Sequence, residues 1–206
     1  MFQRITLKLV LLGNSGVGKS ALMNQYVNNR FSSLYRATIG ADFLVKEIKL
    51  ENKQVIVQIW DTAGTERFQS LGAALYRGSD CCLLVFDLTS ATSFKAVDMW
   101  KKEFLIQAKP SDPQHFPFVL VGNKTDLDSR EVYSRVVQEW CQNNNAQYFE
   151  VSAKEAVNVN EAFIAAVKMS LKYWDQHKEE EEKKTADYIQ LGSDKHPDKF
   201  KEACSC

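Results

Sequence analysis

Short apolar segments alternate along the chain with segments in which apolar residues recur every three or four positions. The apolar segments predict strands, and the three-to-four spacing predicts amphipathic helices. Strands are expected over 7–12, 43–50, 54–60, 81–86, 118–121 and 147–151, and helices over 18–28, 67–77, 92–108, 132–143 and 159–174. Alternating strands and helices are joined by crossover connections, so the fold class is α/β: a mostly parallel sheet of six strands with helices on both faces.

The segments 43–50 and 54–60 are separated only by residues 51–53, which predicts a hairpin. This hairpin gives the sheet one antiparallel edge strand. In an open sheet of this kind a ligand binds at the carboxyl ends of the strands. Polar or glycine-rich segments that directly follow a strand are therefore the candidates for a site.

Composition narrows the class of protein. The chain has 206 residues, of which 45% are hydrophobic and 25% charged, as in a soluble globular domain with its own core. Lys and Arg together number 26, as do Asp and Glu, and a neutral chain is not built for bulk attraction to nucleic acid. We find no apolar run near the roughly 20 residues of a membrane span and no secretory signal at the start.

The composition changes near residue 175. Residues 175–206 contain nine acidic residues, six lysines and few large apolar residues. Such a segment cannot bury enough surface to offset its ordering entropy. We expect a domain over 1–174 and a flexible, disordered tail over 175–206. Cys81, Cys82 and Cys141 lie in apolar or helical segments and are expected to be buried, reduced thiols of a cytosolic protein.

The strongest chemical motif is residues 13–20, Gly-Asn-Ser-Gly-Val-Gly-Lys-Ser, which follows the first strand and precedes the first helix. Its pattern is the G-x-x-x-x-G-K-[ST] phosphate-binding loop. Glycines let backbone N–H groups turn toward phosphates, and the helix N-terminus favours an anion. Lys19 supplies a cation for the outer phosphates, and Ser20 supplies a hydroxyl for Mg²⁺. The alternative is a glycine turn that only joins strand to helix.

Two further motifs also follow strands. Asp61 and Gly64 come directly after the strand 54–60: the carboxylate can orient Mg²⁺, and a glycine leaves its N–H open to a terminal phosphate. Asp126, in Asn123-Lys124-Thr125-Asp126, can accept hydrogen bonds from the N1–H and N2–H₂ edge of guanine, for which adenine has no equivalent donors. Ser152-Ala153-Lys154 follows the next strand and can close over the same base. Each segment alone could be an ordinary turn, and their joint occurrence favours a guanine nucleotide.

In this order and spacing, the motifs resemble the Ras-like small GTPases over residues 6 to about 174. Residues 39–43, 66–68, 75–78 and 84–89 look like segments that distinguish the Rab family within that superfamily. Residues 24–28, 37–44, 68–72, 80–82 and 104–108 look like its late-endosomal (Rab seven) subtype. The resemblance implies the P-loop NTPase fold of a G domain, with GTP and GDP as ligands and Mg²⁺ as cofactor.

The resemblance also implies roles for individual residues. Thr38 would be the switch I threonine that contacts Mg²⁺ and the terminal phosphate, Phe31 would cap the purine, and residues 64 to about 77 would be switch II. The expected magnesium ligands are Ser20, Thr38 and Asp61, and the expected catalytic groups are Lys19, Thr38, Gly64 and Thr65. The nucleotide contacts expected in all are Ser15, Gly16, Val17, Gly18, Lys19, Ser20, Ala21, Phe31, Tyr35, Thr38, Gly64, Asn123, Lys124, Asp126, Ser152, Ala153 and Lys154.

The chain departs from the family pattern at two positions. Thr65 stands where the family usually has a Gln that positions the attacking water. Its shorter side chain cannot orient that water in the same way, so unassisted hydrolysis should be slow. The effector face of Rab proteins usually carries three aromatic residues, and here Phe43 and Trp60 match while the third position is Leu75.

The chain ends in Cys204-Ser205-Cys206, which fits the Rab signal for two geranylgeranyl groups. Stable anchoring takes two signals, and the tail is not polybasic, so a second lipid would supply the second one. The resemblance implies an exchange factor, a GTPase-activating protein, a GDP-dissociation inhibitor or escort protein, and effectors as partners. It implies the cytoplasmic face of late endosome, lysosome, vacuole or phagosome membranes as the location, with cycling through the cytosol.

The sequence is compatible with three functions. The first is a Mg²⁺-dependent GTPase switch in endosomal traffic. The second is a scaffold that holds GTP and hardly hydrolyses it, as Thr65 suggests. The third, a P-loop kinase or other phosphotransferase, would need a site for an acceptor substrate, and we see no insert for one between the motifs.

Overall fold

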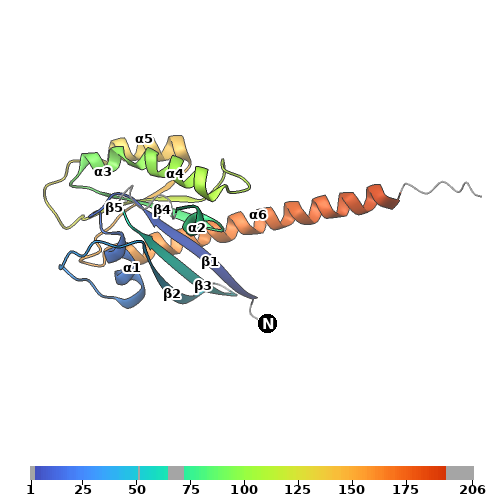
Figure 1. The fold of residues 1–206 in the computed structure, drawn as a ribbon, viewed down its shortest axis with the longest axis horizontal. Coiled ribbons are helices and arrows are strands. Elements are labelled where there is room, and N and C mark those ends of the chain that lie inside the picture. Colours follow the sequence, from blue (N-terminus) through green and yellow to red (C-terminus); the bar gives the residue numbers. More distant parts are fainter. Residues whose placement is uncertain (1–2, 51, 65–71, 194–206) are drawn as a thin grey trace, which may run out of the picture. The chain divides into compact units, whose positions relative to one another are not determined.

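The computed structural model describes residues 3–50, 52–64 and 72–193, which divide at Tyr173 and Trp174 into two units. The first unit is an α/β domain (Figure 1). Its strands are β1 (Gln3–Leu12), β2 (Ala41–Leu50), β3 (Lys53–Thr62), β4 (Cys81–Asp87), β5 (Phe118–Asn123) and β6 (Gln147–Glu150). The helices are α1 (Lys19–Asn28), α2 (Gly72–Tyr76), α3 (Ala91–Lys95), α4 (Val97–Ala108), α5 (Ser134–Asn144) and α6 (Val159–Ser193).

The strands form one sheet in the order β2-β3-β1-β4-β5-β6. The pair β2 and β3 is antiparallel, with Phe43 opposite Trp60, and the other pairs are parallel. The predicted hairpin, six-stranded sheet and single antiparallel edge are therefore confirmed. After β1 the chain builds the β3 and β2 side of the sheet, and it then returns to the other side of β1 with β4. Ligands bind at such a reversal of strand order, outside the carboxyl ends of the strands, and the loop after β1 lies there.

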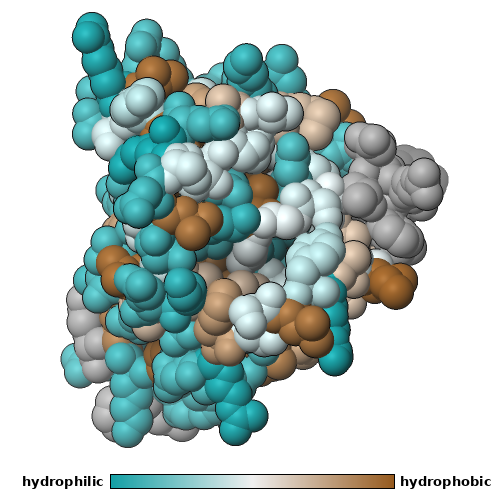
Figure 2. Space-filling view, turned by 90° about the vertical axis from the view of Figure 1, so that its left-hand side faces the viewer, coloured by the Kyte–Doolittle hydropathy of each residue, from teal (hydrophilic) through white to brown (hydrophobic). Residues whose placement is uncertain are grey.

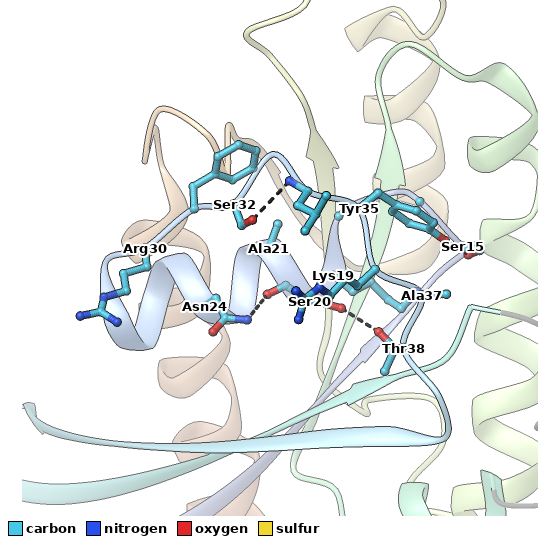
Figure 3. A pocket seen from close by; sticks show the side chains of 15 residues that line it. Ser15, Lys19, Ser20, Ala21, Asn24, Arg30, Ser32, Tyr35, Ala37 and Thr38 are labelled. Carbon is cyan, nitrogen blue, oxygen red and sulfur yellow. Dashed lines mark hydrogen bonds between the residues drawn. The ribbon is translucent and has the colours of Figure 1, made fainter.

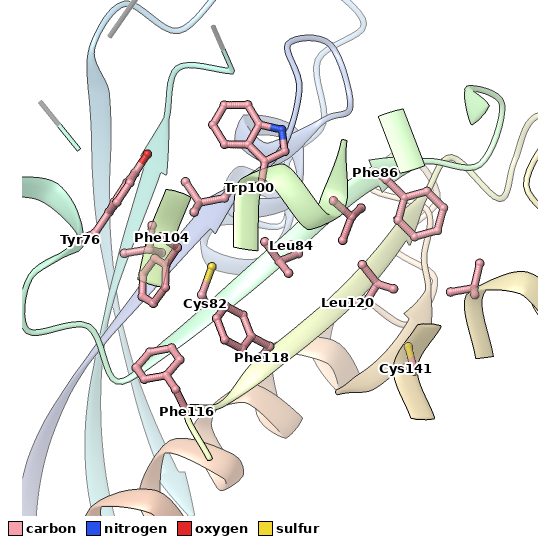
Figure 4. Close-up of a cluster of buried hydrophobic side chains, with 14 of the residues drawn as sticks. Tyr76, Cys82, Leu84, Phe86, Trp100, Phe104, Phe116, Phe118, Leu120 and Cys141 are labelled. Carbon is pink, nitrogen blue, oxygen red and sulfur yellow. The ribbon is translucent and has the colours of Figure 1, made fainter. Parts of the chain in front are cut away.

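Alternate residues of the central strands face two layers of helices. Cys82, Leu84 and Phe86 of β4 pack with Trp100 and Phe104 of α4 in one cluster of buried side chains (Figure 4). On the opposite face, the Tyr26 ring of α1 stacks on the Phe163 ring of α6 with centroids 4.1 Å apart. The near-continuous burial of β4 and β5 follows from this two-sided cover.

The three cysteines that the structure describes, Cys81, Cys82 and Cys141, are buried and free, as predicted. Burial raises the pKa of each thiol, because the charged thiolate loses its hydration there. These groups are therefore protonated at neutral pH and act as small apolar core residues.

One predicted helix is divided in the structure, and part of the expected tail is helical. The helix predicted over 92–108 is interrupted at Ala96, so α3 and α4 are separate, and Ser90 caps α3 by accepting a hydrogen bond from the Ser93 N–H. Helix α6 continues through residues 175–193 of the expected tail. The Glu, Lys, Gln and Ala residues of this segment are good helix formers. The flexibility of the tail stays a prediction. No helix among the described residues is long and apolar enough to cross a membrane.

Candidate nucleotide site

The loops that carry the motifs follow β1, β3, β5 and β6, and they meet at the carboxyl ends of these strands. A pocket of about 550 Å³ lies here, lined by the phosphate loop, the start of α1 and residues 30–38. This is the size range of small-molecule sites. Figure 3 shows the lining side chains, and Figure 2 shows this end of the molecule as a hollowed, largely hydrophilic face. Nine of the expected nucleotide contacts line this pocket, and their contact with a nucleotide stays a prediction: Ser15, Gly16, Gly18, Lys19, Ser20, Ala21, Phe31, Tyr35 and Thr38.

Lys19 begins α1 and is buried beneath the phosphate loop. Its ammonium donates to the carbonyl oxygens of Gly13 at 2.9 Å and Asn14 at 3.1 Å. Burial lowers the pKa of Lys19 to about 8, and the nearby Asp61 charge opposes this shift. The group therefore stays mostly protonated at neutral pH, and the loop carbonyls hold it at the pocket.

Gly18 lies against the side chain of Asn123, the last residue of β5. It caps α1 in the left-handed conformation, with φ +100°, and a Cβ atom there would lie 2.2 Å from the Asn123 amide nitrogen. That amide instead donates to the Val17 carbonyl at 2.8 Å. The Asn123 side chain thereby connects the phosphate-binding and base-binding loops.

Three oxygen-bearing side chains converge beside Lys19. The Ser20 hydroxyl hydrogen-bonds to Thr38 Oγ1 at 2.8 Å (Figure 3) and donates to the Asp61 carboxylate, and Thr38 Oγ1 lies 3.2 Å from the same Asp61 oxygen. The other carboxylate oxygen, Oδ1, is buried and has no hydrogen-bond partner among the described residues. Burial raises the pKa of Asp61, while the Ser20 hydroxyl and the Lys19 charge oppose the shift.

These oxygens fit Mg²⁺, which takes hard ligands and is typically held by one or two carboxylates together with substrate phosphates and water. The unpartnered Oδ1 atom of Asp61 is the observation that carries this fit, because a buried carboxylate oxygen without a partner is costly. Among the described residues no three His, Cys, Asp or Glu side chains cluster as an alternative metal site.

Gly64 lies against the phosphate loop. Its carbonyl accepts a hydrogen bond from the Ser15 N–H at 3.0 Å, and a Cβ atom at Gly64 would lie 2.3 Å from the Ser15 nitrogen. Only glycine permits this approach of one backbone to the other. The Ser15 and Tyr35 hydroxyls are 2.9 Å apart, so the loop over 30–38 also contacts the phosphate loop.

Asp126 lies in the part of the site that is expected to bind the base. Its side chain is only 6% exposed, and its carboxylate accepts from the Ser152 hydroxyl at 2.7 Å and lies 3.6 Å from the Lys154 ammonium. Burial alone would raise the pKa of Asp126, but the Ser152 hydroxyl, its own backbone N–H and Lys154 together lower it. The carboxylate is therefore charged at neutral pH and able only to accept hydrogen bonds.

The loops after β5 and β6 are joined around this carboxylate. The Ala153 N–H donates to Asn123 Oδ1 at 3.1 Å, and Lys124 forms an ion pair with Asp87 at 2.6 Å. The expected base-binding residues Asn123, Lys124, Asp126, Ser152, Ala153 and Lys154 are thus brought together.

Comparison with known proteins decides the family. Residues 8–172 match the Ras family. The chain is 53% identical over 201 residues to Ras-related protein Rab7 of Drosophila melanogaster, covering 97% of this chain and 96% of that protein. It is 54% identical to Ras-related protein Rab7 of Pisum sativum over 199 residues, 95% of each chain, and 54% identical to Ras-related protein RABG3f of Arabidopsis thaliana over 195 residues, 93% of each.

The chain belongs to the Ras family. It is a small GTPase of the Rab type, and the resemblance drawn from its motifs is confirmed. The Ras-family fold and the mixed six-stranded sheet agree with the fold class predicted from the sequence.

The predicted effector face of this Rab-type GTPase is partly assembled in the structure. The Phe43 and Trp60 rings lie opposite each other on β2 and β3, with centroids 4.8 Å apart. Phe43 is exposed, and Trp60 and Leu75 both pack against the core cluster of Figure 4. The role of these three residues in binding effectors stays a prediction.

Some residues around the site were not identified from the sequence. Arg130 pairs through both terminal nitrogens with Glu150, which also accepts from Ser134 and Tyr148 just before the Ser152 loop. This ion pair joins segments 20 residues apart, and no local motif marks it. The predicted residues Thr65, Cys204 and Cys206 lie outside the described residues.

Proposed function

We propose that the chain is a Mg²⁺-dependent GTP/GDP switch that acts in vesicular traffic toward late endosomes, lysosomes or vacuoles. Similarity to relatives named Rab7 over nearly the whole chain supports this cellular role. The observation that carries the switch is the joint contact of Ser20, Thr38 and Asp61, because it connects the loop over 30–40 to the phosphate loop and to β3.

Within this proposal, each residue has one task. Lys19 and the N–H groups of the phosphate loop bind the phosphates and stabilise charge that develops during hydrolysis. Asp126, with the Ser152 loop, selects guanine. Ser20, Thr38 and Asp61 would hold Mg²⁺, which neutralises phosphate charge when it is bound. Thr38 and Gly64 respond to the terminal phosphate, so its loss would release the two loops they belong to.

The test is single-turnover hydrolysis of GTP by the full chain, with Mg²⁺ and with a chelator. Ser20→Asn should weaken GTP binding more than GDP binding, because the hydroxyl matters most when the terminal phosphate shares the ion. Ser90→Asn is the matched control: it makes the same exchange at the start of α3, where Asn also caps a helix. Equal GTP and GDP affinities in Ser20→Asn would refute the assignment.

A second candidate is a scaffold that holds GTP with very slow hydrolysis. The observation that favours it is Thr65 at the position where the family usually has Gln. Single-turnover hydrolysis with and without cell extract distinguishes the two candidates. A switch hydrolyses GTP faster when the extract supplies an activating protein, whereas a scaffold does not.

We further propose the partners and the membrane attachment that Rab-type GTPases share. These partners are an exchange factor, a GTPase-activating protein, a GDP-dissociation inhibitor or escort protein, and effectors that bind Phe43, Trp60 and Leu75. Two geranylgeranyl groups on Cys204 and Cys206 would attach the tail to the membrane. The location of the tagged chain in cells tests the late-endosomal assignment.

A further inference from the structure

One hydrogen bond ties the phosphate loop to the helical layer behind it. Trp100 of α4 donates its indole N–H to Asn14 Oδ1 at 2.7 Å, across 86 positions of sequence. The Trp100 side chain is 4% exposed and belongs to the core cluster, at whose margin Figure 4 places it. The donor is therefore fixed by packing, whereas its acceptor is the second residue of the loop that binds phosphate.

The backbone of Asn14 touches two groups assigned to the phosphates. Its carbonyl accepts a hydrogen bond from the Lys19 ammonium at 3.1 Å. Gly64 lies so close to it that a Cβ atom there would be 2.4 Å from the Asn14 carbonyl carbon and 2.7 Å from the oxygen. A shift of the Asn14 peptide would therefore move Lys19 and Gly64 together.

The same helix supports the far end of the segment that begins at Gly64. The Tyr76 ring of α2 packs on the Phe104 ring of α4 at 5.7 Å, and Leu75 packs against the same cluster. Helix α4 thus contacts the phosphate loop through Trp100 and the end of α2 through Phe104.

We infer that Trp100 is a positioning residue for GTP hydrolysis: its indole N–H fixes the Asn14 peptide and thereby places the Lys19 ammonium and the Gly64 N–H at the terminal phosphate. This inference rests on the proposed role of residues 13–20 as the phosphate loop. A purely structural Trp100 would affect folding and would change GTP and GDP binding equally. A positioning Trp100 acts on the terminal phosphate, which GDP lacks.

The test uses Trp100→Phe, which keeps an aromatic ring and removes the N–H. The matched control is Trp140→Phe, which removes another indole hydrogen bond, 2.8 Å long, to Asp98 of the same helix and away from the phosphate loop. Dissociation rates of GTP and GDP and the single-turnover hydrolysis rate are measured for each. Trp100→Phe should slow hydrolysis about fivefold, which corresponds to the roughly 1 kcal/mol of one hydrogen bond. It should also speed GTP release more than GDP release, whereas Trp140→Phe should match the parent.

Asn14→Ala removes the same bond from the loop side, and it keeps the test decisive if Trp100→Phe does not fold. The double variant should be no slower than the slower single variant, because both changes delete one interaction. The inference is overturned if Trp100→Phe has the hydrolysis rate of the parent and the same ratio of GTP to GDP dissociation rates. If Trp100→Phe does not fold, the same result in Asn14→Ala overturns it. GTP binding that survives Lys19→Ala would instead refute the phosphate loop itself, and the inference would fall with it.

Discussion

Replacing Asp126 by Asn tests how the base is selected. The carboxylate is almost fully buried, and its lowered pKa keeps it charged, so it can only accept hydrogen bonds. The N1–H and N2–H₂ groups of guanine are both donors, and an amide presents its NH₂ where the carboxylate presented an oxygen. Donor would then face donor at one of the two contacts, while the amide oxygen can still accept from Ser152.

The size of the effect follows from these contacts. A hydrogen bond to a charged group contributes about 1.5–3 kcal/mol and one between neutral groups about 1 kcal/mol. One bond to guanine is lost and the other becomes a neutral one, for a total loss of about 2.5–4.5 kcal/mol. That total corresponds to a fall in GTP affinity by a factor of about 10² to 10³. Xanthine carries a carbonyl where guanine has its NH₂, so affinity for xanthosine triphosphate should rise.

The assay is competition of GTP and xanthosine triphosphate against a fluorescent guanine nucleotide. Asp128→Asn is the matched control, because it makes the same exchange two residues further on, at an exposed side chain. That control should bind like the parent. GTP affinity within threefold of the parent in Asp126→Asn, without a gain for xanthosine triphosphate, would show that another group reads the base.

Three further changes address regions outside the base site. Thr65→Gln should raise intrinsic single-turnover hydrolysis about tenfold, or about 1.4 kcal/mol in the barrier, because the longer amide can orient the water; an unchanged rate would contradict this. Replacing Cys204 and Cys206 together by Ser should move the chain to the soluble fraction with GTP binding intact, and each single change should give partial retention; membrane retention of the double variant would point to another anchor. Arg130→Met should lower the free energy of unfolding by about 1–2 kcal/mol at neutral pH. Since Arg130 lowers the pKa of Glu150, the loss should shrink as the pH falls through that lowered pKa, and a loss independent of pH in denaturant titrations would exclude the pair as its cause.

The sheet was predictable because its signal is repeated along the chain. Each buried strand is an apolar run, and each crossover helix has its own periodicity, so six strands and their mostly parallel pairing follow without tertiary information. The prediction of one helix over 92–108 was wrong because the local sequence is compatible with two states, and Ala96 interrupts a stretch that is otherwise good for one helix. Residues 175–193 also combine two tendencies, the charge of a disordered segment and the propensity of a helix, and the flexible tail stays a prediction.

The residues of the candidate nucleotide site could be brought together from the sequence for a different reason. In this fold the ligand is bound by short segments that each follow one strand, so every contact set is nearly continuous in sequence. Trp100 with Asn14 and Arg130 with Glu150 lack that property, because each bond joins residues from separate segments and each residue alone resembles an ordinary core or surface position. These two contacts can be identified only in the structure, where the fold places the separate segments side by side.

This division has a consequence for how the switch would work. In the proposed function the residues found by motif contact the nucleotide directly, so a change at Asp126 or Ser20 should alter which ligand is bound. Residues found only from the structure position the contacting residues, so a change at Trp100 should alter the rate at which bound GTP is hydrolysed. Competition between GTP and xanthosine triphosphate separates a change at Asp126 from a change at Trp100, because only the loss of a base contact alters which base is bound. A misplaced Asn14 peptide instead leaves guanine recognition unchanged and acts where Lys19 and Gly64 meet the terminal phosphate.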